Sequence, residues 1–324
     1  MTIEPSGQSD ASEPELDSAF EISEPQVLAS ALVFSSPHSG SVYPRGFLEC
    51  SRLSSLQLRR SEDAFVDQLF EGCLSIGAPM IKALFPRTYL DLNREPYELD
   101  PRMFDGRLPP FANTRSIRVA GGLGTIPRVV GHAQEIYASR LPLEEAMRRI
   151  EKLYKPYHAR LSGLLTRAQL HFGLAVLIDC HSMPSGVSPL GAIAPPGLIS
   201  SRNRETAAGG ETKQRPDFVL GDRHGASCAT FLVDVIETQL RRLGYSVARN
   251  KPYAGGFITE SYGNPAANRH ALQIEVSRGL YMNEQNVTRS ERFDEVRAAL
   301  TQVAIALAET VATRLLAAAR DAAE

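Results

Sequence analysis

The predicted fold rests on the stretch LAVLIDCH, which runs from Leu174 to His181. The stretch is almost entirely apolar until Asp179, Cys180 and His181 close it. Apolar residues in an unbroken run, rather than in alternation with polar ones, are typical of a strand that is covered on both faces. The segment before it carries apolar residues three or four positions apart over 143–168, which predicts a long amphipathic helix leading into the strand.

The rest of the chain continues this alternation of strands and helices. A short apolar run at 31–34 ends in SSPHSG and predicts a second buried strand followed by a loop. Further strands are expected at 217–221, 245–248 and 272–276, and further helices from about Ser61 and over 293–315. Such alternation indicates an α/β fold with a mixed, largely parallel central sheet flanked by helices.

Residues 1–28 differ in composition from the rest of the chain. They contain seven acidic residues but no Lys or Arg, and Ser and Pro fill much of the remainder. Such a segment buries too little apolar surface to offset its ordering entropy, so we expect a disordered acidic tail. It also lacks the basic and apolar regions of a signal peptide. Residues 29–324 are expected to form a single domain, with a mobile surface loop at 200–216.

The overall composition excludes several classes of protein. The 35 Lys and Arg residues nearly balance the 37 Asp and Glu residues, so the net charge of -2 gives no general attraction to nucleic acid or to an anionic membrane. No run of 18 apolar residues occurs, which argues against a membrane-spanning helix. The four cysteines are far apart and form no C-x-x-C pair, which favours a reduced, cytoplasmic protein over a disulfide or zinc-knuckle scaffold.

Two histidines follow predicted strands, at positions where α/β proteins bind ligands. His38 follows the strand at 31–34 and His181 follows the strand at 174–179, and both have Ser or Gly neighbours that leave space for a ligand. Two imidazoles, one carboxylate and an open position form a common catalytic zinc site. The alternative is that each histidine is an ordinary hydrogen-bonded residue of the core or of a loop.

The third ligand of such a site would be a carboxylate. Glu62 and Asp63 both open the predicted helix behind Ser61, and the helical projection slightly favours Glu62 because it lies nearer the apolar face. An acid on a buried helix face needs a partner, which a metal ion would supply. The alternative is that both acids only stabilise the helix N-terminus.

Two further segments place charged groups among apolar residues. RTYLDLNR, from Arg87 to Arg94, combines two guanidinium groups with Asp91 and Asn93; this suits a substrate carboxylate but is also typical of a surface ion network. Glu275 interrupts the apolar strand LQIEV, where a carboxylate is costly unless it is used or paired. The alternative is that strand alternation places Glu275 on a solvent-exposed face.

Six motifs of this sequence occur in the order and spacing of one known family. They are SPHSG (36–40), SED (61–63), DLNR (91–94), IDCHS (178–182), GDRHG (221–225) and QIEVSRGLYMNE (273–284). Together they span about 31–284 and resemble the N-formylglutamate amidohydrolase family. This family is similar, more distantly, to zinc carboxypeptidases and aspartoacylases, and the resemblance implies their phosphorylase/hydrolase-like α/β fold.

The resemblance also implies roles for the candidate metal-site residues. The zinc ligands would be His38, Asp63 and His181, with Asp63 rather than its neighbour Glu62 as the acid. Glu275 resembles the late glutamate that serves the distant relatives as general base. A bound Zn²⁺ would polarise the substrate carbonyl and activate the attacking water.

The remaining candidate residues would contact the substrate. Arg87 resembles the arginine that polarises the scissile carbonyl in aspartoacylase-like enzymes. We expect Asn93 and Arg94 to hold one substrate carboxylate, and Arg278 or His224 to hold a second. The expected activity is therefore zinc-dependent hydrolysis of N-formyl-L-glutamate, or of a similar N-acyl amino acid, to formate and glutamate.

Two alternative functions remain at this point. The same zinc site could belong to a carboxypeptidase-like peptidase or to another N-acyl amino acid hydrolase, because acyl-group preference depends on the shape of the pocket. A metal-free protein could instead use the arginines to bind an acidic metabolite. In each case the expected partner is a small acidic molecule, not nucleic acid or a membrane.

Overall fold

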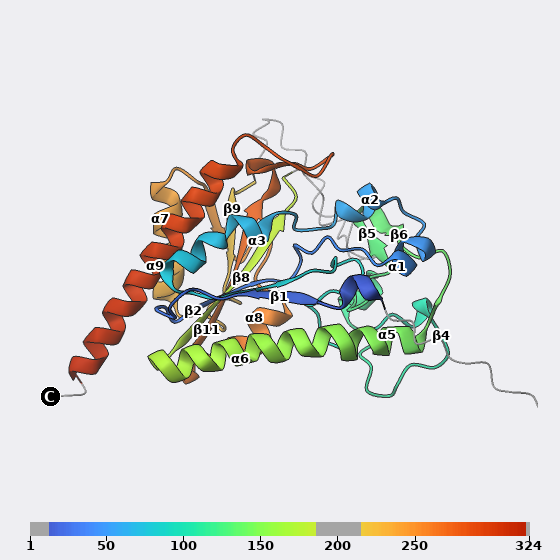
Figure 1. Cartoon of the computed structure of the whole chain (residues 1–324), viewed down its shortest axis with the longest axis horizontal. Coiled ribbons are helices and arrows are strands. Elements are labelled where there is room, and N and C mark those ends of the chain that lie inside the picture. The colour runs from blue at the N-terminus through green and yellow to red at the C-terminus, as the bar shows by residue number, and fades with distance from the viewer. Residues whose placement is uncertain (1–12, 186–214, 322–324) are drawn as a thin grey trace, which may run out of the picture.

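Strands from both ends of the described chain, residues 13–185 and 215–321, form one central sheet in this computed structural model (Figure 1). β3, β2, β8 and β11 are parallel to one another, β1 is antiparallel to β3, and β9, which is parallel to β10, is antiparallel to β11. The expected mixed, largely parallel sheet is confirmed. Its seven strands lie in the order β1 (Phe20–Ser23), β3 (Met80–Ala83), β2 (Leu32–Ser36), β8 (Ala175–Met183), β11 (Arg269–Ser277), β9 (Phe218–Gly221) and β10 (Val247–Arg249).

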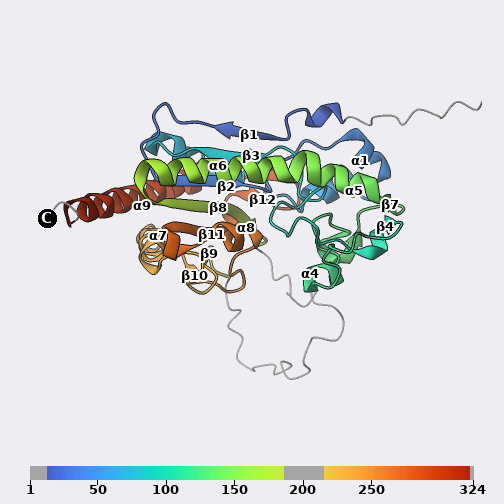
Figure 2. The ribbon, with the colours of Figure 1, turned by 90° about the horizontal axis from the view of Figure 1, so that it is seen from below.

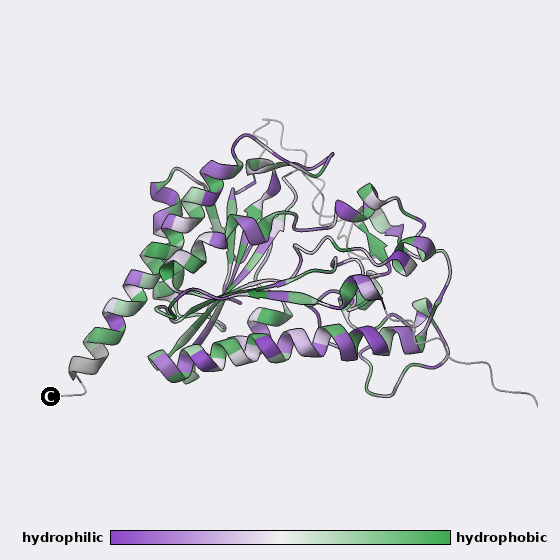
Figure 3. Ribbon diagram, in the orientation of Figure 1, coloured by the Kyte–Doolittle hydropathy of each residue, from purple (hydrophilic) through white to green (hydrophobic). Residues whose placement is uncertain are grey.

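Helices cover both faces of this sheet (Figures 1 and 2). A π-helical turn, Ile150–Tyr154, joins the helix Leu143–Arg149 to the helix Lys155–Phe172. Each layer of helices buries its own hydrophobic core against the sheet, and Figure 3 shows apolar residues concentrated in the strands and on the inward faces of the helices. One face carries α3 (Val66–Leu69), α7 (Thr230–Arg242) and α9 (Phe293–Asp321), and the other carries α5 (Leu143–Arg149), α6 (Lys155–Phe172) and α8 (Phe257–Tyr262).

Side chains of β8 alternate between the two cores. Val176, Ile178 and Cys180 pack in the core under α7 and α9, whereas Leu177 packs in the core under α6. By the same alternation, Asp179 and the histidine two residues later point to the face of α6. All nine residues of β8 are buried, as expected for a strand that is covered on both faces.

The chain between β3 and α5 leaves the sheet and forms short elements beside it (Figure 2). They are the 3₁₀ turn Pro101–Met103, α4 (Ile117–Ala120), the pair β4 (Phe104–Asp105) and β7 (Leu141–Pro142), and the pair β5 (Val129–Val130) and β6 (Gln134–Glu135) with the 3₁₀ turn Gly131–Ala133 between them. The other short elements are α1 (Arg45–Cys50), α2 (Ser55–Arg59), β12 (Met282–Asn283), β13 (Thr288–Arg289) and the 3₁₀ turns Pro14–Leu16, Glu71–Ile76, Pro265–Ala267 and Arg278–Leu280.

Most of the predicted elements are confirmed, but the helix expected from Ser61 is not. Residues 61–65 form a turn, and the helix begins only at Val66. Phe65 has a left-handed backbone with φ of 64°, which no helix interior allows. The backbone N–H of Asp63 donates to the carbonyl of His38 at 3.0 Å, so the turn is attached to the loop that follows β2.

The predicted disordered tail is wrong over residues 13–28. Phe20–Ser23 is strand β1, which pairs with the edge strand β3, and Phe20 and Ile22 pack against the core under α6. Glu13 forms an ion pair with Arg148 at 3.0 Å. The backbone pairing and these contacts offset the entropy lost when the segment becomes ordered. The composition of the segment does not reveal these contacts. Residues 1–12, and the predicted loop over 200–214, lie outside the described residues.

Within the described residues, α9 is long and apolar enough to cross a membrane over Phe293–Ala317, by length and composition alone. This departs from the sequence expectation, which counted only unbroken apolar runs. Residues along one side of α9, from Phe293 to Val311, are buried in the core against α3 and α7. Packing in the core therefore accounts for the apolar residues on that side of α9, and 33% of the apolar window is buried.

Candidate metal centre and active site

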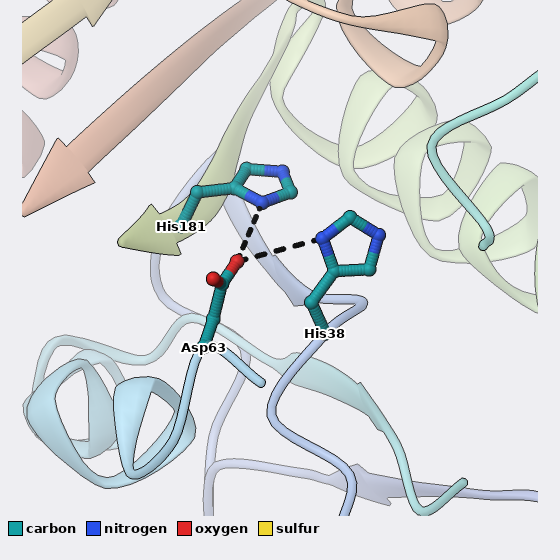
Figure 4. Close-up of side chains that lie close together, drawn as sticks. All are labelled: His38, Asp63 and His181. Atoms are coloured by element: carbon teal, nitrogen blue, oxygen red, sulfur yellow. Dashed lines mark hydrogen bonds and ion pairs between the residues drawn. The ribbon is translucent and has the colours of Figure 1, made fainter. Parts of the chain in front are cut away.

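Three side chains that could bind a metal ion meet at the carboxyl edge of the parallel strands (Figure 4). His38 lies two residues after β2, His181 lies near the end of β8, and Asp63 comes from the turn before α3. β3 and β8 flank β2 on opposite sides, so this edge is a topological switch point, where α/β proteins bind ligands. All three side chains are buried, and their ligand atoms lie within 4.8 Å of one another.

The two imidazoles face the carboxylate of Asp63 with the same ring nitrogen. Oδ2 of Asp63 lies 3.1 Å from Nδ1 of His181 and 3.4 Å from Nδ1 of His38. Nε2 of His38 lies 2.8 Å from Oδ1 of Asp91, and Nε2 of His181 lies 2.9 Å from Oδ2 of Asp179. Histidines that bind metals usually donate the other ring N–H to a carboxylate, which leaves the inner nitrogen free as a ligand. His38 has such a hydrogen bond to Asp91, whereas His181 and Asp179 make a close ion-pair contact without a hydrogen bond.

One nitrogen of this group lacks a hydrogen bond. Nδ1 of His38 is buried and makes no hydrogen bond within the part of the chain that the structure describes. A buried polar atom without a partner is costly, and a cation held between the three side chains would remove that cost. Two imidazoles and a carboxylate are donors that zinc accepts. The group therefore fits a divalent metal ion.

Asp63, and not Glu62, faces the two histidines. Glu62 is also buried, but its carboxylate accepts a hydrogen bond from the hydroxyl of Tyr43 at 2.7 Å and pairs with Arg59 at 3.3 Å. The helical projection that favoured Glu62 is wrong because residues 61–65 are not helical. Asp63 is the acid that the resemblance to the amidohydrolase family implied.

The environment of Asp63 keeps its carboxylate charged. Burial alone would raise the pKa of Asp63. The imidazoles of His181 and His38 outweigh this effect and hold the pKa well below its usual range, and the guanidinium groups of Arg87 and Arg278 act in the same direction. A carboxylate that stays ionised when buried is suited to binding a cation.

Glu275 lies beside the candidate metal centre. It is directly opposite His181 in the parallel register of β11 and β8, and both residues line the same cavity. The carboxylate of Glu275 accepts a hydrogen bond from the amide of Gln273 at 2.7 Å. Burial raises the pKa of Glu275 to about 7, with His181 opposing the shift and Asp63 adding to it. The alternative of a solvent-facing glutamate is wrong, because Glu275 is buried on a sheet that is covered on both faces.

A cavity of about 460 Å³ opens at this edge of the sheet. His38, His181 and Glu275 line it, as do four of the predicted substrate-contacting residues: Arg87, Asn93, Arg94 and Arg278. Three more arginines that the sequence analysis did not single out also line it: Arg60, Arg118 and Arg215. A cavity with this many guanidinium groups suits a small anionic ligand.

The arginines of the RTYLDLNR segment are organised by Asp91. Nη2 of Arg87 donates to Oδ2 of Asp91 at 2.9 Å, and Nη2 of Arg94 lies 3.5 Å from the same oxygen. Arg94 also donates to the backbone carbonyls of Leu123 and Asn93, at 2.9 and 2.7 Å. The alternative of a surface ion network is therefore wrong, since Asp91 and Asn93 are buried and the segment forms a wall of the cavity.

Asn93 connects the RTYLDLNR segment to the start of α8, on another side of the cavity. Its Oδ1 accepts a hydrogen bond from the backbone N–H of Ile258 at 2.8 Å, and its Nδ2 lies 3.2 Å from Nε2 of His181. A Cβ atom on Gly256 would lie 2.4 Å from the Asn93 amide, so only glycine allows this approach. Asn93 thus contributes to the shape of the cavity as well as to its polar lining.

His224 is not brought together with the other predicted site residues. It is exposed on the loop between β9 and α7, and it does not line the cavity. Its left-handed backbone, with φ of 57°, and the hydrogen bond from its N–H to Oδ1 of Asn250 at 3.3 Å fix it in that loop. The GDRHG motif therefore has a turn-forming role in the described structure.

Two of the site residues that sequence reasoning missed differ in the signal that they gave. Asp179 could have been found, because it is a charged residue inside the apolar stretch LAVLIDCH, two positions before His181. A carboxylate on the same face of a strand as a candidate ligand is a natural partner for that ligand. Arg118 gave no comparable signal, since it lies in a short helix that belongs to none of the motifs identified in the sequence.

A mixed α/β sheet with a His/Asp/His group, an adjacent buried glutamate and an arginine-lined cavity at its carboxyl edge defines a hydrolase-type site for a small anionic molecule. The model of the N-formylglutamate amidohydrolase family matches residues 30–282. The chain belongs to this family, whose members are amide-cleaving hydrolases.

Individual relatives agree with this membership. The N-formylglutamate deformylase of Pseudomonas putida is 29% identical over 225 residues, which cover 68% of this chain and 71% of the relative. That of Pseudomonas aeruginosa is 27% identical over 257 residues, covering 78% and 83%. The crystal structure of N-formylglutamate amidohydrolase from Ralstonia eutropha JMP134 superposes with a TM-score of 0.81 at 36% identity, covering 91% of this chain and 99% of that one.

Proposed function

We propose that this chain is a zinc-dependent amidohydrolase that converts N-formyl-L-glutamate to formate and glutamate. The observation that carries the proposal is the position of Glu275 beside His181, next to a buried group of metal-binding type and within an arginine-lined cavity. The names of the Pseudomonas and Ralstonia relatives support the substrate.

His38, Asp63 and His181 would hold the zinc ion, and Asp91 and Asp179 would keep the two imidazoles in the ligating tautomer. When bound, zinc supplies a Lewis acid that polarises the amide carbonyl and lowers the pKa of water.

Glu275 would act as the general base and then as the general acid. It takes a proton from the water that attacks the formyl carbon, and it delivers a proton to the leaving nitrogen as the C–N bond breaks. The products are then formate and a free amino group. A carboxylate whose pKa is raised to about 7 by burial is suited to both transfers near neutral pH.

Two arginines and an amide would bind and polarise the substrate. Arg87, which Asp91 holds in place, would donate to the carbonyl oxygen as negative charge develops there. Asn93 and Arg94 would bind one substrate carboxylate at the adjacent wall. Arg278 donates to Ser182, to the backbone carbonyl of Arg60 and to Asp63, so it would act through its charge and by fixing the metal ligand Asp63.

We also propose that the chain acts as a single catalytic domain in the cytoplasm, which comprises the predicted residues 29–324 together with strand β1. The support for one domain is that a single sheet receives strands from the whole described chain and that the site draws on β2, β8 and β11 together. The four cysteines are free, which agrees with a reducing compartment. Limited proteolysis and cell fractionation test these two statements.

The activity is tested by measuring formate release from N-formyl-L-glutamate, with N-acetyl-L-glutamate and N-acetyl-L-aspartate as competing candidates. We expect one zinc per chain by mass spectrometry, loss of activity with a chelator and recovery when zinc is added back. Full activity in chelated, metal-free protein would disprove the zinc mechanism. A strong preference for either acetylated substrate would be compatible with the zinc mechanism, but it would show that N-formyl-L-glutamate is not the preferred substrate.

A further inference from the structure

Arg118 differs from the other arginines of the cavity in its hydrogen bonding. Arg60, Arg87, Arg94, Arg215 and Arg278 each donate at least one hydrogen bond to a described residue. The Arg118 side chain donates none within the described residues, and its nearest carboxylate oxygen, on Glu98, lies 3.9 Å from Nη1. That distance exceeds a hydrogen bond, so the planar donor fork of Arg118 remains available to a ligand.

The position of Arg118 adds positive charge to one wall of the cavity. Burial lowers the pKa of Arg94, and the like charges of Arg87 and Arg118 add to that effect although Asp91 opposes it. Arg118 is therefore close enough to Arg94 to repel it, and Glu98, which lies 3.9 Å from Arg118, offsets part of this repulsion. An anion bound at this wall would relieve the repulsion.

The segment that carries Arg118 also offers apolar contacts. Leu123, Pro127, Val129 and Val130 follow it in the chain and line the same cavity. A guanidinium group next to apolar side chains matches a carboxylate at the end of two methylene groups. With 40% of its side chain exposed, Arg118 can be reached by such a ligand without rearrangement of the core.

We propose that Arg118 binds the side-chain carboxylate of the substrate and so selects acidic N-formyl amino acids over neutral ones. This inference rests on the proposed function, and it assigns the second carboxylate to a residue other than Arg278 or His224. Each of the three side-chain nitrogens of Arg278 already donates one hydrogen bond to the protein, and His224 lies outside the cavity. The carboxylate would accept two parallel hydrogen bonds from the fork of Arg118.

The test compares N-formyl-L-glutamate with N-formyl-L-glutamine, which has nearly the same shape but no side-chain charge. Arg118→Ala should lower kcat/KM for the glutamate substrate roughly 10- to 100-fold, mainly through KM, and should leave the glutamine substrate nearly unchanged. Arg118→Lys should recover part of the loss, because it keeps the charge without the fork. Arg115→Ala is the control, since Arg115 is exposed in the same segment and does not line the cavity.

Binding of the free amino acids provides a readout that does not depend on turnover. Calorimetry with the zinc-loaded proteins should show that wild type and Arg115→Ala bind L-glutamate more tightly than L-glutamine, and that Arg118→Ala does not. If wild type hydrolyses neither formyl substrate, the proposed function fails, and this binding comparison still decides the role of Arg118. Equal preference for glutamate in all three proteins, or no preference in wild type, overturns the role of Arg118.

Discussion

Glu275 and His181 are directly paired across the parallel strands β11 and β8, and both line the cavity at the end of the sheet. Paired positions of adjacent strands are fixed by the backbone ladder, so the proposed base is held at a constant distance from a proposed metal ligand. Neither side chain depends on a loop for its position. A site on rigid strands tolerates little displacement, and small changes to either residue should therefore have large effects on catalysis.

Replacing Glu275 with glutamine tests the general base. Glu275→Gln keeps the size of the side chain but cannot accept the proton of the attacking water, so kcat should fall about 10²- to 10⁴-fold. Zinc content and KM should stay near the wild-type values. The acidic limb of the pH–rate profile, which reports the protonation of a base whose pKa is raised to about 7, should also disappear. Unchanged kcat in a zinc-loaded Glu275→Gln protein would rule out the role.

The identity of the acidic ligand is tested by a matched pair of neighbours. Asp63→Ala should lose zinc, as should His38→Ala and His181→Ala, because each removes one of the three proposed ligands. Glu62→Ala should keep zinc, since its carboxylate faces Tyr43 and Arg59. Zinc per chain is measured by mass spectrometry on protein whose circular dichroism shows a folded chain. Loss of zinc in Glu62→Ala but not in Asp63→Ala would reverse the assignment.

Asp179 should affect metal binding without being a ligand. Asp179→Asn removes the charge behind His181, and the affinity for zinc should fall about 10- to 100-fold. Competition with a chromophoric chelator gives this affinity directly. Asp105→Asn serves as the control because Asp105 is exposed in β4, far along the chain from the ligands. An affinity for zinc equal to wild type would show that Asp179 does not orient the imidazole.

Arg94 should affect substrate binding and not metal binding. Arg94→Lys keeps the positive charge but loses the fork that can bind a carboxylate through two hydrogen bonds. We expect KM for N-formyl-L-glutamate to rise roughly 10-fold or more, with zinc content unchanged. Arg107→Lys, at an exposed position, is the matched control. Identical kinetics in Arg94→Lys and wild type would remove Arg94 from the substrate site.

His158 should make stability depend on pH at a distance from the metal centre. Its imidazole lies 3.0 Å from the carbonyl of Leu92 and 2.9 Å from the hydroxyl of Tyr262, and burial lowers its pKa to about 4, although the Leu92 carbonyl opposes the shift. The unfolded chain, with a pKa near 6.5, therefore takes up the proton first as pH falls. The free energy of unfolding should decrease by about 1–3 kcal/mol between pH 6.5 and 4.

Urea unfolding at several pH values measures this effect. The His158→Gln variant should lose that part of the decrease, and His171→Gln, at an exposed position on the same helix, should behave like wild type. The same decrease in His158→Gln and wild type would show that other groups cause it.

The sequence was sufficient for the features that local patterns determine. The apolar run before His181 correctly predicted a doubly covered strand, and the cluster of polar residues after each apolar run correctly placed His38 and His181 at one edge of the sheet. The motif resemblance correctly gave the family. These signals depend on neighbours in the chain, and a single sequence contains them.

Features that depend on tertiary contacts could not be predicted in this way. A helical projection favoured Glu62 because the sequence does not show that the helix starts only at Val66. The left-handed backbone of Phe65, which precedes the helix, is unusual for a phenylalanine and has no local sequence marker. β1 is recognisable only through its pairing with β3. Arg118 lines the cavity although it belongs to the short elements beside the sheet, and no local pattern indicates this.

The backbone hydrogen bond from Asp63 to the carbonyl of His38 has a consequence for the life of the protein in the cell. It joins two of the proposed ligands through the main chain, whether or not an ion is present. Because this link needs no ion, we expect the metal-free chain to fold with these two residues already close together. Removing and restoring the metal should then switch the proposed activity off and on without unfolding the chain, which circular dichroism can follow.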